Sequence, residues 1–197
     1  MKNKKIRFLN ILLLILIITA IILVIIIGKE YLQRKNNDDN LKQVVEEIKQ
    51  KTQTSNTDEE IPYIEYEGYQ VIGTIQIPKI KIEYPILIES TEDSLKKSIT
   101  RVGNGKVNET GNLTLAGHNF LNASMFGRID KLENNDEIII SDLYGNQVTY
   151  KVFDKYVTDP NDVRVLEGVE KNKKEITLIT CINGRENRLI IKARENK

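Results

Sequence analysis

The chain has 197 residues, and its 29 Lys and Arg nearly balance its 28 Asp and Glu, which leaves a net charge of +1. A single Cys and a single His exclude an intramolecular disulfide, a structural zinc site built on several thiolates, and a metal centre built on several histidines. The sequence contains neither a glycine-rich phosphate loop nor a basic patch with interleaved aromatic residues, so we expect no nucleotide and no nucleic acid as a partner.

The first predicted element is a transmembrane helix over residues 8–28. Nearly all of these residues are aliphatic or aromatic, and about 20 residues at 1.5 Å each cover roughly 30 Å, the thickness of the hydrocarbon core of a bilayer. A cleaved signal peptide is the alternative, but its apolar region usually has about 7–15 residues and ends at a small-x-small site. The residues around Gly28 offer no such site. We therefore predict an uncleaved signal anchor.

The distribution of charge predicts the orientation of this helix. Residues 1–35 carry a net charge of +6, whereas residues 36–197 carry −5. Basic residues flank the apolar segment on both sides with a small excess before it, which favours a cytoplasmic N-terminus. We expect a single-pass protein of the cell membrane, with a cytoplasmic tail over residues 1–7 and the rest of the chain outside the cell. A lone Cys suits that location, because it has no partner for oxidation within its own chain.

Residues 29–65 are predicted to form an extracellular stalk. An amphipathic helix is expected within residues 38–52 from the i, i+3, i+4, i+7 spacing of Leu41, Val44, Val45 and Ile48. The stretch Thr52–Glu60 has no apolar residue and is typical of a flexible linker. The alternative is that the helix packs on the domain that follows it.

From residue 66 to residue 197 the pattern is that of an all-β domain. Alternating apolar residues bounded by Gly, Asn, Asp or Pro predict short strands at 71–77, 80–84, 112–116, 137–140, 147–157, 175–181 and 188–193. Short helices are predicted at 92–99, 123–132 and 162–166. Seven or eight short strands in about 130 residues indicate a closed or nearly closed eight-stranded, antiparallel-rich β-barrel, because closure removes exposed sheet edges.

Cys181 stands at the end of one predicted strand. A period of two places it on the same face as Thr177 and Ile179, opposite Leu178 and Thr180. A Cys in an apolar strand is more often an inert, buried residue. Here it comes directly before a polar stretch, where functional groups usually lie, so it is also a candidate nucleophile.

His118 likewise follows a strand end, that of the strand 112–116. A lone His is ordinarily a surface residue or a satisfied core residue. A Cys nucleophile, however, needs a group that gives and takes protons, and His is the usual choice. The positions of the only Cys and the only His therefore suggest a pair on one rim of the barrel.

Arg188 begins the last predicted strand. A hairpin with the strand that ends at Cys181 would place the two residues side by side. A guanidinium there can stabilise a thiolate or a developing oxyanion, because its charge is permanent and its N–H groups form a fixed fork. Arg185, at the tip of the turn, is the alternative.

The combination of these motifs resembles the sortase family, the cell-wall transpeptidases of Gram-positive bacteria. The similarity covers about residues 68–195 and rests on Thr177-Leu-Ile-Thr-Cys181, on Arg188 heading an aliphatic strand, and on the upstream Ala116-Gly-His118-Asn. It implies that Cys181 is the nucleophile of a thioester-forming cysteine transpeptidase, that His118 is the general acid and base, and that Arg188 stabilises the oxyanion or positions the substrate.

The resemblance also implies the surroundings and the substrates of this site. Thr180 would line the site, and Ala116 and Gly117 would be close-approach positions beside His118. The substrates would be an LPXTG-like sorting signal of a secreted protein, cleaved between Thr and Gly, and an amine of a peptidoglycan precursor or a pilin. A cysteine hydrolase of the same signal and a non-catalytic, membrane-tethered β-barrel interaction module stay open as alternatives.

Features of the sequence bear on the sortase class and on metals. The short segment 159–174 argues against class B, although residues 119–127 resemble it, and the lack of a DPW or DPF lid motif argues against class C. A class A or D pattern is therefore favoured. No cofactor is expected, and the one alternative is calcium held by acidic loop residues among Glu92, Asp93, Glu109, Asp162 and Glu167.

Overall fold

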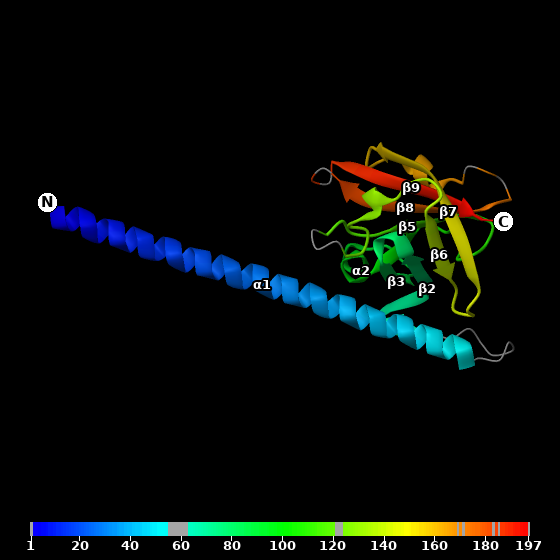
Figure 1. Ribbon diagram of the computed structural model, residues 1–197, viewed down its shortest axis with the longest axis horizontal. Helices are drawn as coiled ribbons and strands as arrows, with labels where there is room; N and C mark the ends of the chain where they lie inside the picture. Colours follow the sequence, from blue (N-terminus) through cyan, green and yellow to red (C-terminus); the bar gives the residue numbers. More distant parts are fainter. Residues whose placement is uncertain are drawn as a thin grey trace. The chain divides into compact units, whose positions relative to one another are not determined.

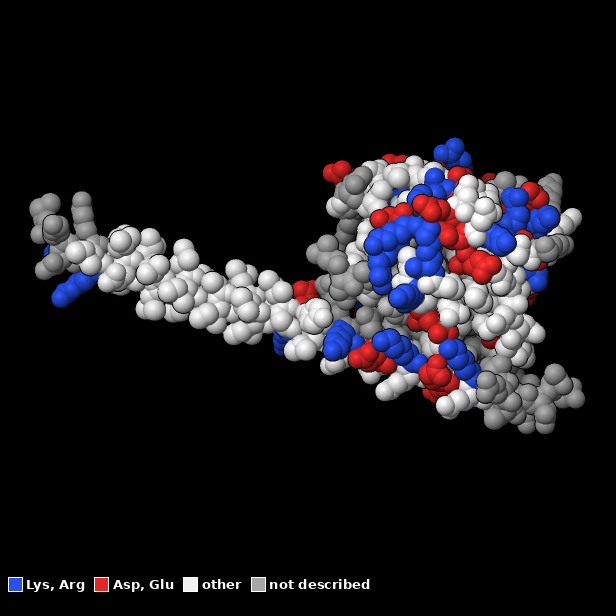
Figure 2. All heavy atoms as spheres, in the orientation of Figure 1, with Lys and Arg blue, Asp and Glu red and all other residues white. Residues whose placement is uncertain are grey.

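The fold is described from a computed structural model that covers residues 2–54, 63–120, 124–168, 170, 172–182, 184 and 186–196. The chain forms two units, Met1–Asn40 and Leu41–Lys197. The first unit is the N-terminal part of one helix, α1 (Lys2–Thr54) (Figure 1). This helix is long and apolar enough to cross a membrane, with a mean hydropathy of 3.6 in its most apolar stretch. Figure 2 shows that stretch without charged side chains, whereas both signs of charge are interspersed over the visible face of the second unit.

Helix α1 is continuous where the sequence predicted two separate helices. The residues between the predicted helices, such as Glu30, Leu32 and Gln33, have high helix propensity, and no Gly or Pro interrupts them after Gly28. Residues 29–37, for which no helix was predicted, are therefore helical as well.

The last turns of α1 pack on the second unit, to which they belong. Leu41, Val45 and Ile48 are at most 3% exposed. Lys49 forms an ion pair with Glu83, with 3.0 Å between Nζ and Oε1. These contacts favour the alternative in which the amphipathic helix packs on the domain instead of standing clear of it as a stalk. Residues 55–60 of the predicted linker lie outside the described residues.

Nine strands in the described part of the chain form one sheet, and eight of them close into the predicted barrel. The order around the barrel is β2-β3-β4-β5-β8-β9-β7-β6, and pairing of β6 with β2 closes it. The ninth strand, β1, extends β2 as a short hairpin. The strands are β1 (Glu65–Tyr66), β2 (Tyr69–Ile77), β3 (Ile82–Leu87), β4 (Ile99–Val102), β5 (Gly111–Ala116), β6 (Glu137–Ser141), β7 (Gln147–Thr158), β8 (Lys174–Ile182) and β9 (Asn187–Glu195).

The pairing of β5 with β8 is parallel, whereas most other pairs in the barrel are antiparallel. Ala116 at the end of β5 lies opposite Ile179 of β8. Because the two strands run in the same direction, both of their carboxyl ends reach the same rim of the barrel. The chain just after β5 therefore lies beside the last residues of β8.

The barrel interior is filled by the inward-facing residues of the alternating strands. Fully buried side chains from separate strands meet there, among them Ile75, Ile86, Leu115, Ile140, Leu178 and Ile191. The outward-facing residues of β8 and β9 include polar ones, namely Thr177, Cys181, Arg188 and Lys192. This alternation separates the packing face of the sheet from the face that can hold a site.

Three short elements differ from their predictions. The predicted helix at 123–132 is reduced to the 3-10 turn η2 (Ile129–Lys131), because Met125 has a left-handed backbone with φ of 49° and the amide of Phe126 bonds the carbonyl of His118. The strand β4 was not predicted. The strand predicted to stop before Pro85 runs through it to Leu87. The remaining helices are α2 (Glu92–Lys97), η1 (Pro78–Ile80) and η3 (Val163–Leu166).

Candidate active site

Strands β8 and β9 bring Cys181 and Arg188 together. The two residues are register partners in the antiparallel pair, as the hairpin prediction requires. Ile179 lies opposite Ile190, and Thr177 lies opposite Lys192, so the pattern of pairs continues down the outer face of the sheet. Cys181 is a free thiol and partly exposed. Because period-two alternation turns it outward, the thiol stands on the face that ligands can reach.

The segment that carries His118 is bonded on both sides to the strand of Cys181. Before His118, the Gly117 amide donates to the carbonyl of Ile179 over 3.1 Å. After it, Nδ2 of Asn119 donates to the carbonyl oxygen of Cys181 over 3.0 Å. His118 is thus held between two attachments to β8, at the rim where β5 and β8 end. The imidazole also lies against the Phe120 ring, with 4.8 Å between ring centroids.

The loop after His118 is anchored from a third strand. The amide of Phe126 donates to the carbonyl of His118 over 3.1 Å, and Asn119 and Met125 form an isolated β-bridge. The buried Tyr84 of β3 accepts a hydrogen bond at its hydroxyl from the Met125 amide over 3.2 Å. That bond supports the left-handed backbone of Met125, which a residue with a side chain adopts only at a cost. These contacts fix the base of the loop.

Ala116, Gly117 and Thr180, the residues predicted to line the site, differ in what they contact. Ala116 lines a pocket on the outer face. Gly117 is a close-approach position, since a Cβ there would lie 2.6 Å from Cδ1 of Ile99 and 2.8 Å from Cδ2 of Phe126. Thr180 does not line that pocket, because alternation turns it inward, where it is 3% exposed and its hydroxyl donates to the carbonyl of Gly117 over 2.7 Å. Thr180 therefore ties the strand of Cys181 to the segment of His118.

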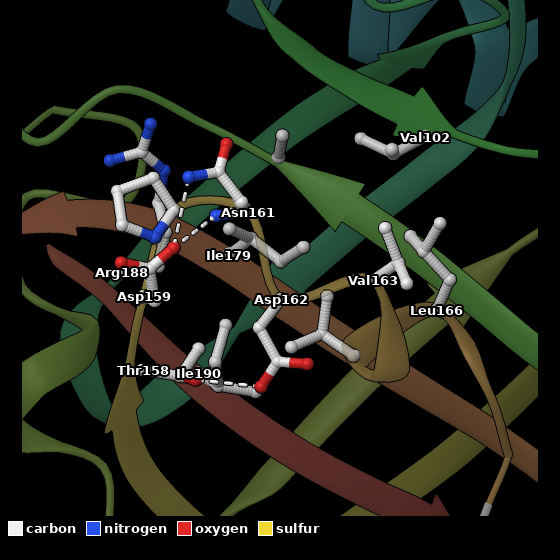
Figure 3. A pocket seen from close by; sticks show the side chains of 13 residues that line it. Val102, Thr158, Asp159, Asn161, Asp162, Val163, Leu166, Ile179, Arg188 and Ile190 are labelled. Carbon is white, nitrogen blue, oxygen red and sulfur yellow. Dashed lines mark hydrogen bonds between the residues drawn. The ribbon is translucent and has the colours of Figure 1, made fainter.

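A pocket of about 600 Å³ opens on the outer face beside Arg188. Its floor is formed by β5, β8 and β9, and one wall is formed by the connection between β7 and β8, which includes η3. The apolar lining includes Val102, Ala116, Ile179, Ile190, Val163 and Leu166. Arg188, Asp159 and Asn161 also line this pocket (Figure 3). Cys181 lies two residues beyond Ile179 on the same face, which is roughly 7 Å along the strand.

Polar groups at the rim of the pocket are held by their own partners. Asp159 accepts hydrogen bonds from the amide and the side chain of Asn161. Asp162 caps η3 and pairs with Arg164, with 2.8 Å between Nε and Oδ1. The hydrogen bonds from Arg164 keep the pKa of Asp162 below its usual range. These contacts give the connection a defined shape. The alternative site residue Arg185 lies outside the described residues.

The acidic residues considered for calcium are engaged separately in the part of the chain that the structure describes. Asp93 accepts from the hydroxyl of Tyr69, Glu109 pairs with Lys106, and Asp162 pairs with Arg164. Among the described residues, no group of three or more His, Cys, Asp or Glu could hold a metal ion. The absence of a cofactor, with calcium as the one alternative, stays a prediction.

The site also contains residues that the sequence did not single out. Asn119 and the apolar side chains of η3 are the main additions. Asn119 follows the only His directly, but nothing in a single sequence indicates that its amide reaches a carbonyl 62 residues away. The apolar residues Val163, Val165 and Leu166 within an otherwise polar connection were the one available signal for the pocket wall.

The chain is similar to known proteins in both sequence and structure. A family model described as Sortase domain matches residues 75–196. Sortase A of Bacillus anthracis is 37% identical over 119 residues, which are 60% of this chain and 55% of that protein, and Sortase D of Bacillus subtilis is 29% identical over 113 residues, which are 57% and 54%. The matches thus span about half the length of these curated relatives. A solved structure of a Clostridium perfringens Sortase D5 transpeptidase aligns with a TM-score of 0.66 at 35% identity, over 80% of this chain and 98% of that one.

Proposed function

The chain belongs to the sortase family, and from this premise we propose that it is a membrane-anchored cysteine transpeptidase that cleaves an LPXTG-like sorting signal. The observation that carries the proposal is the pairing of Cys181 with Arg188 across β8 and β9, next to a His118 segment bonded to the same strand. A nucleophile, a proton carrier and a fixed cation are the parts that acyl transfer through a thioester requires.

In the proposed reaction, the thiolate of Cys181 attacks the carbonyl carbon of the threonine in the signal. The tetrahedral intermediate carries an oxyanion, which the guanidinium of Arg188 stabilises. When the intermediate collapses, the Thr–Gly bond breaks, and His118 gives a proton to the leaving amine, which leaves Cys181 as a thioester. An acceptor amine, from a peptidoglycan precursor or a pilin, then loses a proton to His118 and attacks the thioester. An amide forms, and the thiolate of Cys181 is released.

The pocket beside Arg188 is the proposed binding site for the residues of the signal that precede its threonine. Apart from Arg188, its lining from β5, β8 and β9 is apolar, as aliphatic side chains require. An extended peptide advances about 3.3 Å per residue, so a chain seated over Ile179 reaches Cys181 after about two residues. The threonine carbonyl would then lie near the thiol while the leading residues fill the pocket.

The class of the enzyme and its location are part of the same proposal. The described residues between β7 and β8 include one helix, the short η3, instead of a long inserted helix, which supports a class A or D pattern over class B. The match to the Clostridium perfringens Sortase D5 transpeptidase points the same way. The apolar part of α1 would anchor the protein in the cell membrane, with residues 1–7 in the cytoplasm and the barrel outside.

The test uses the full chain in detergent micelles and a quenched LPXTG-type peptide, with and without glycine oligomers as amine donors. We expect cleavage, an amine-dependent product, and loss of both in Cys181→Ala. Arg188→Lys should lower kcat by about 10²-fold, because an ammonium cannot reproduce the guanidinium fork. Arg164→Lys is the matched control, since Arg164 pairs with Asp162 at the rim and not with the pair at Cys181.

Other results would select other functions. Cleavage that persists in Cys181→Ala would contradict the thioester mechanism. Cleavage by the unaltered chain without any amine-dependent product would indicate a hydrolase. If the chain binds the peptide but neither cleaves nor transfers it, the interaction-module alternative would replace the enzyme.

A further inference from the structure

The connection between β7 and β8 is attached to the outer face of the barrel by side chains that the proposed reaction does not use. Nζ of Lys192, on β9, donates to the carbonyl of Glu167 over 2.8 Å. Nδ2 of Asn112, on β5, donates to the carbonyls of Leu166 over 3.0 Å and Val165 over 3.3 Å. Two strands that lie on either side of β8 therefore hold the same short segment, Val165–Glu167.

The orientation of Asn112 is itself set by a neighbouring strand. The hydroxyl of Thr177, on β8, donates to Oδ1 of Asn112 over 2.9 Å. With its oxygen engaged in this way, the amide of Asn112 directs its N–H groups toward the connection. Thr177 is fully buried, so water does not compete for this bond.

Lys192 is a buried cation placed under the connection. Lys192 is only 6% exposed, and it lies on the same face of β9 as Arg188 and Ile190. A buried ammonium needs acceptors, and the nearby carboxylate of Glu175 is already bonded to Arg194, with 3.1 Å between Oε1 and NH2. The carbonyl of Glu167 therefore supplies a contact that Lys192 loses if the segment moves away.

The segment also packs closely on the sheet just beyond these bonds. A Cβ at Gly168 would lie 3.2 Å from Oε2 of the buried Glu175, so the backbone there is in contact with the face of β8. Glu170 pairs with Arg194 over 2.7 Å. The attachment is therefore continuous from Val165 to Gly168, with a further ion pair at Glu170.

We propose that Lys192 and Asn112 are positioning residues that hold Val165 and Leu166 in place as the wall of the pocket before the sorting signal binds. The proposal rests on the proposed function, because it assigns the pocket to the signal. Val165 and Leu166 both line the pocket. Asn112 donates to the carbonyls of these two residues, and Lys192 donates to the carbonyl of the residue that follows them, Glu167. A wall held in advance lowers the ordering cost of binding.

The expected effect of losing one attachment on the affinity for the signal follows from the fraction of molecules in which the wall is in place. If only a fraction of the molecules has the wall in place, the apparent dissociation constant of the signal rises by the inverse of that fraction. A hydrogen bond from a charged donor is strong enough for its loss to change such a population by about tenfold or more. The rate of chemistry at Cys181 should change little, because Lys192 does not touch the reacting groups.

The test compares Lys192→Met with Lys155→Met in the full chain in detergent. Lys155 is a matched control, because its Nζ also donates to backbone carbonyls, those of Asp130 and Leu132, but at a loop that does not line the pocket. Hydrogen exchange of the peptide covering residues 162–168 should become about tenfold faster in Lys192→Met and stay unchanged in Lys155→Met. With the LPXTG-type peptide, KM should rise about tenfold in Lys192→Met, and kcat should change less than about threefold.

Two results would overturn the proposal: unchanged exchange in Lys192→Met, or faster exchange with an unchanged KM. Asn112→Ala is the second variant, used if Lys192→Met does not fold, and the same two readouts apply to it. A failure of the proposed function is distinguishable, because the unaltered chain would then not cleave the peptide. In that case the exchange measurement, which needs no substrate, decides whether the attachment holds the connection.

Discussion

Replacing Gly117 by alanine tests how closely the segment of His118 packs on the barrel. A Cβ at this position would lie 2.6 Å from Cδ1 of Ile99 and 2.8 and 2.9 Å from Cδ2 and Cγ of Phe126. Both neighbours are at most 1% exposed, so neither can turn out into solvent. The backbone of Gly117 cannot move freely either, because its carbonyl accepts from Thr180 and its amide donates to Ile179.

The expected cost is that of overpacking a core, about 1–3 kcal/mol. For a unit of the size of residues 41–197, this corresponds to a fall in Tm of roughly 2–12 °C. Because Gly117 directly precedes His118, the same shift should move the imidazole relative to Cys181. We therefore expect slower cleavage of the LPXTG-type peptide in addition to lower stability.

Differential scanning calorimetry of the full chain in detergent measures the change in Tm, and peptide cleavage measures the change in activity. Gly28→Ala is the matched control, since a Cβ at Gly28 meets nothing within 4 Å. The control should leave both quantities unchanged. If Gly117→Ala also unfolds at the temperature of the unaltered chain and cleaves at its rate, the close-approach argument is refuted.

Three further predictions concern the surroundings of the site and the barrel. Asn119→Ala removes the bond to the carbonyl of Cys181, one of the two attachments of the His118 segment to β8, and should slow cleavage of the LPXTG-type peptide by up to about tenfold, and an unchanged rate would contradict this. Burial raises the pKa of Asp136, but hydrogen bonds from Lys79 and a backbone amide outweigh it and leave the pKa lowered, so Asp136→Asn should lower Tm at pH 7, and the difference should shrink as the pH falls below the ordinary Asp pKa of 3.8. Ile48→Ala should cost about 2–5 kcal/mol in urea unfolding of the barrel, and no loss would mean that α1 does not pack on it.

The strands of the barrel were predictable because their alternation is local. β7 and β8 were predicted within one residue of their ends, since each is rich in β-branched and aromatic or aliphatic residues between polar breaks. The four-residue strand β4 was not, because it follows α2 directly and is too short for alternation to show. The continuity of α1 was missed because a change from apolar to polar composition was taken for the end of a helix.

The site was predictable where chemistry depends on residue type and not where it depends on distant contacts. Cys181 and Arg188 could be paired from the hairpin alone, since a short turn brings their strands together. The inward direction of Thr180 also follows from alternation, whereas its role at the site stays a prediction. Asn119 and Lys192 could not be foreseen, because their partners depend on how separate loops lie over the sheet.

The parallel pairing of β5 with β8 has a consequence for how the protein folds. It joins segments about 60 residues apart. Such pairs form late, because the entropy lost on closing a long loop is not offset until the contacts between the strands have formed. In a chain that is still unfolded when it emerges from the membrane, the thiol of Cys181 would therefore be remote from the imidazole of His118. The proposed reactive centre would arise only with closure of the barrel, so cleavage of the LPXTG-type peptide should begin during refolding only after β5 and β8 have paired.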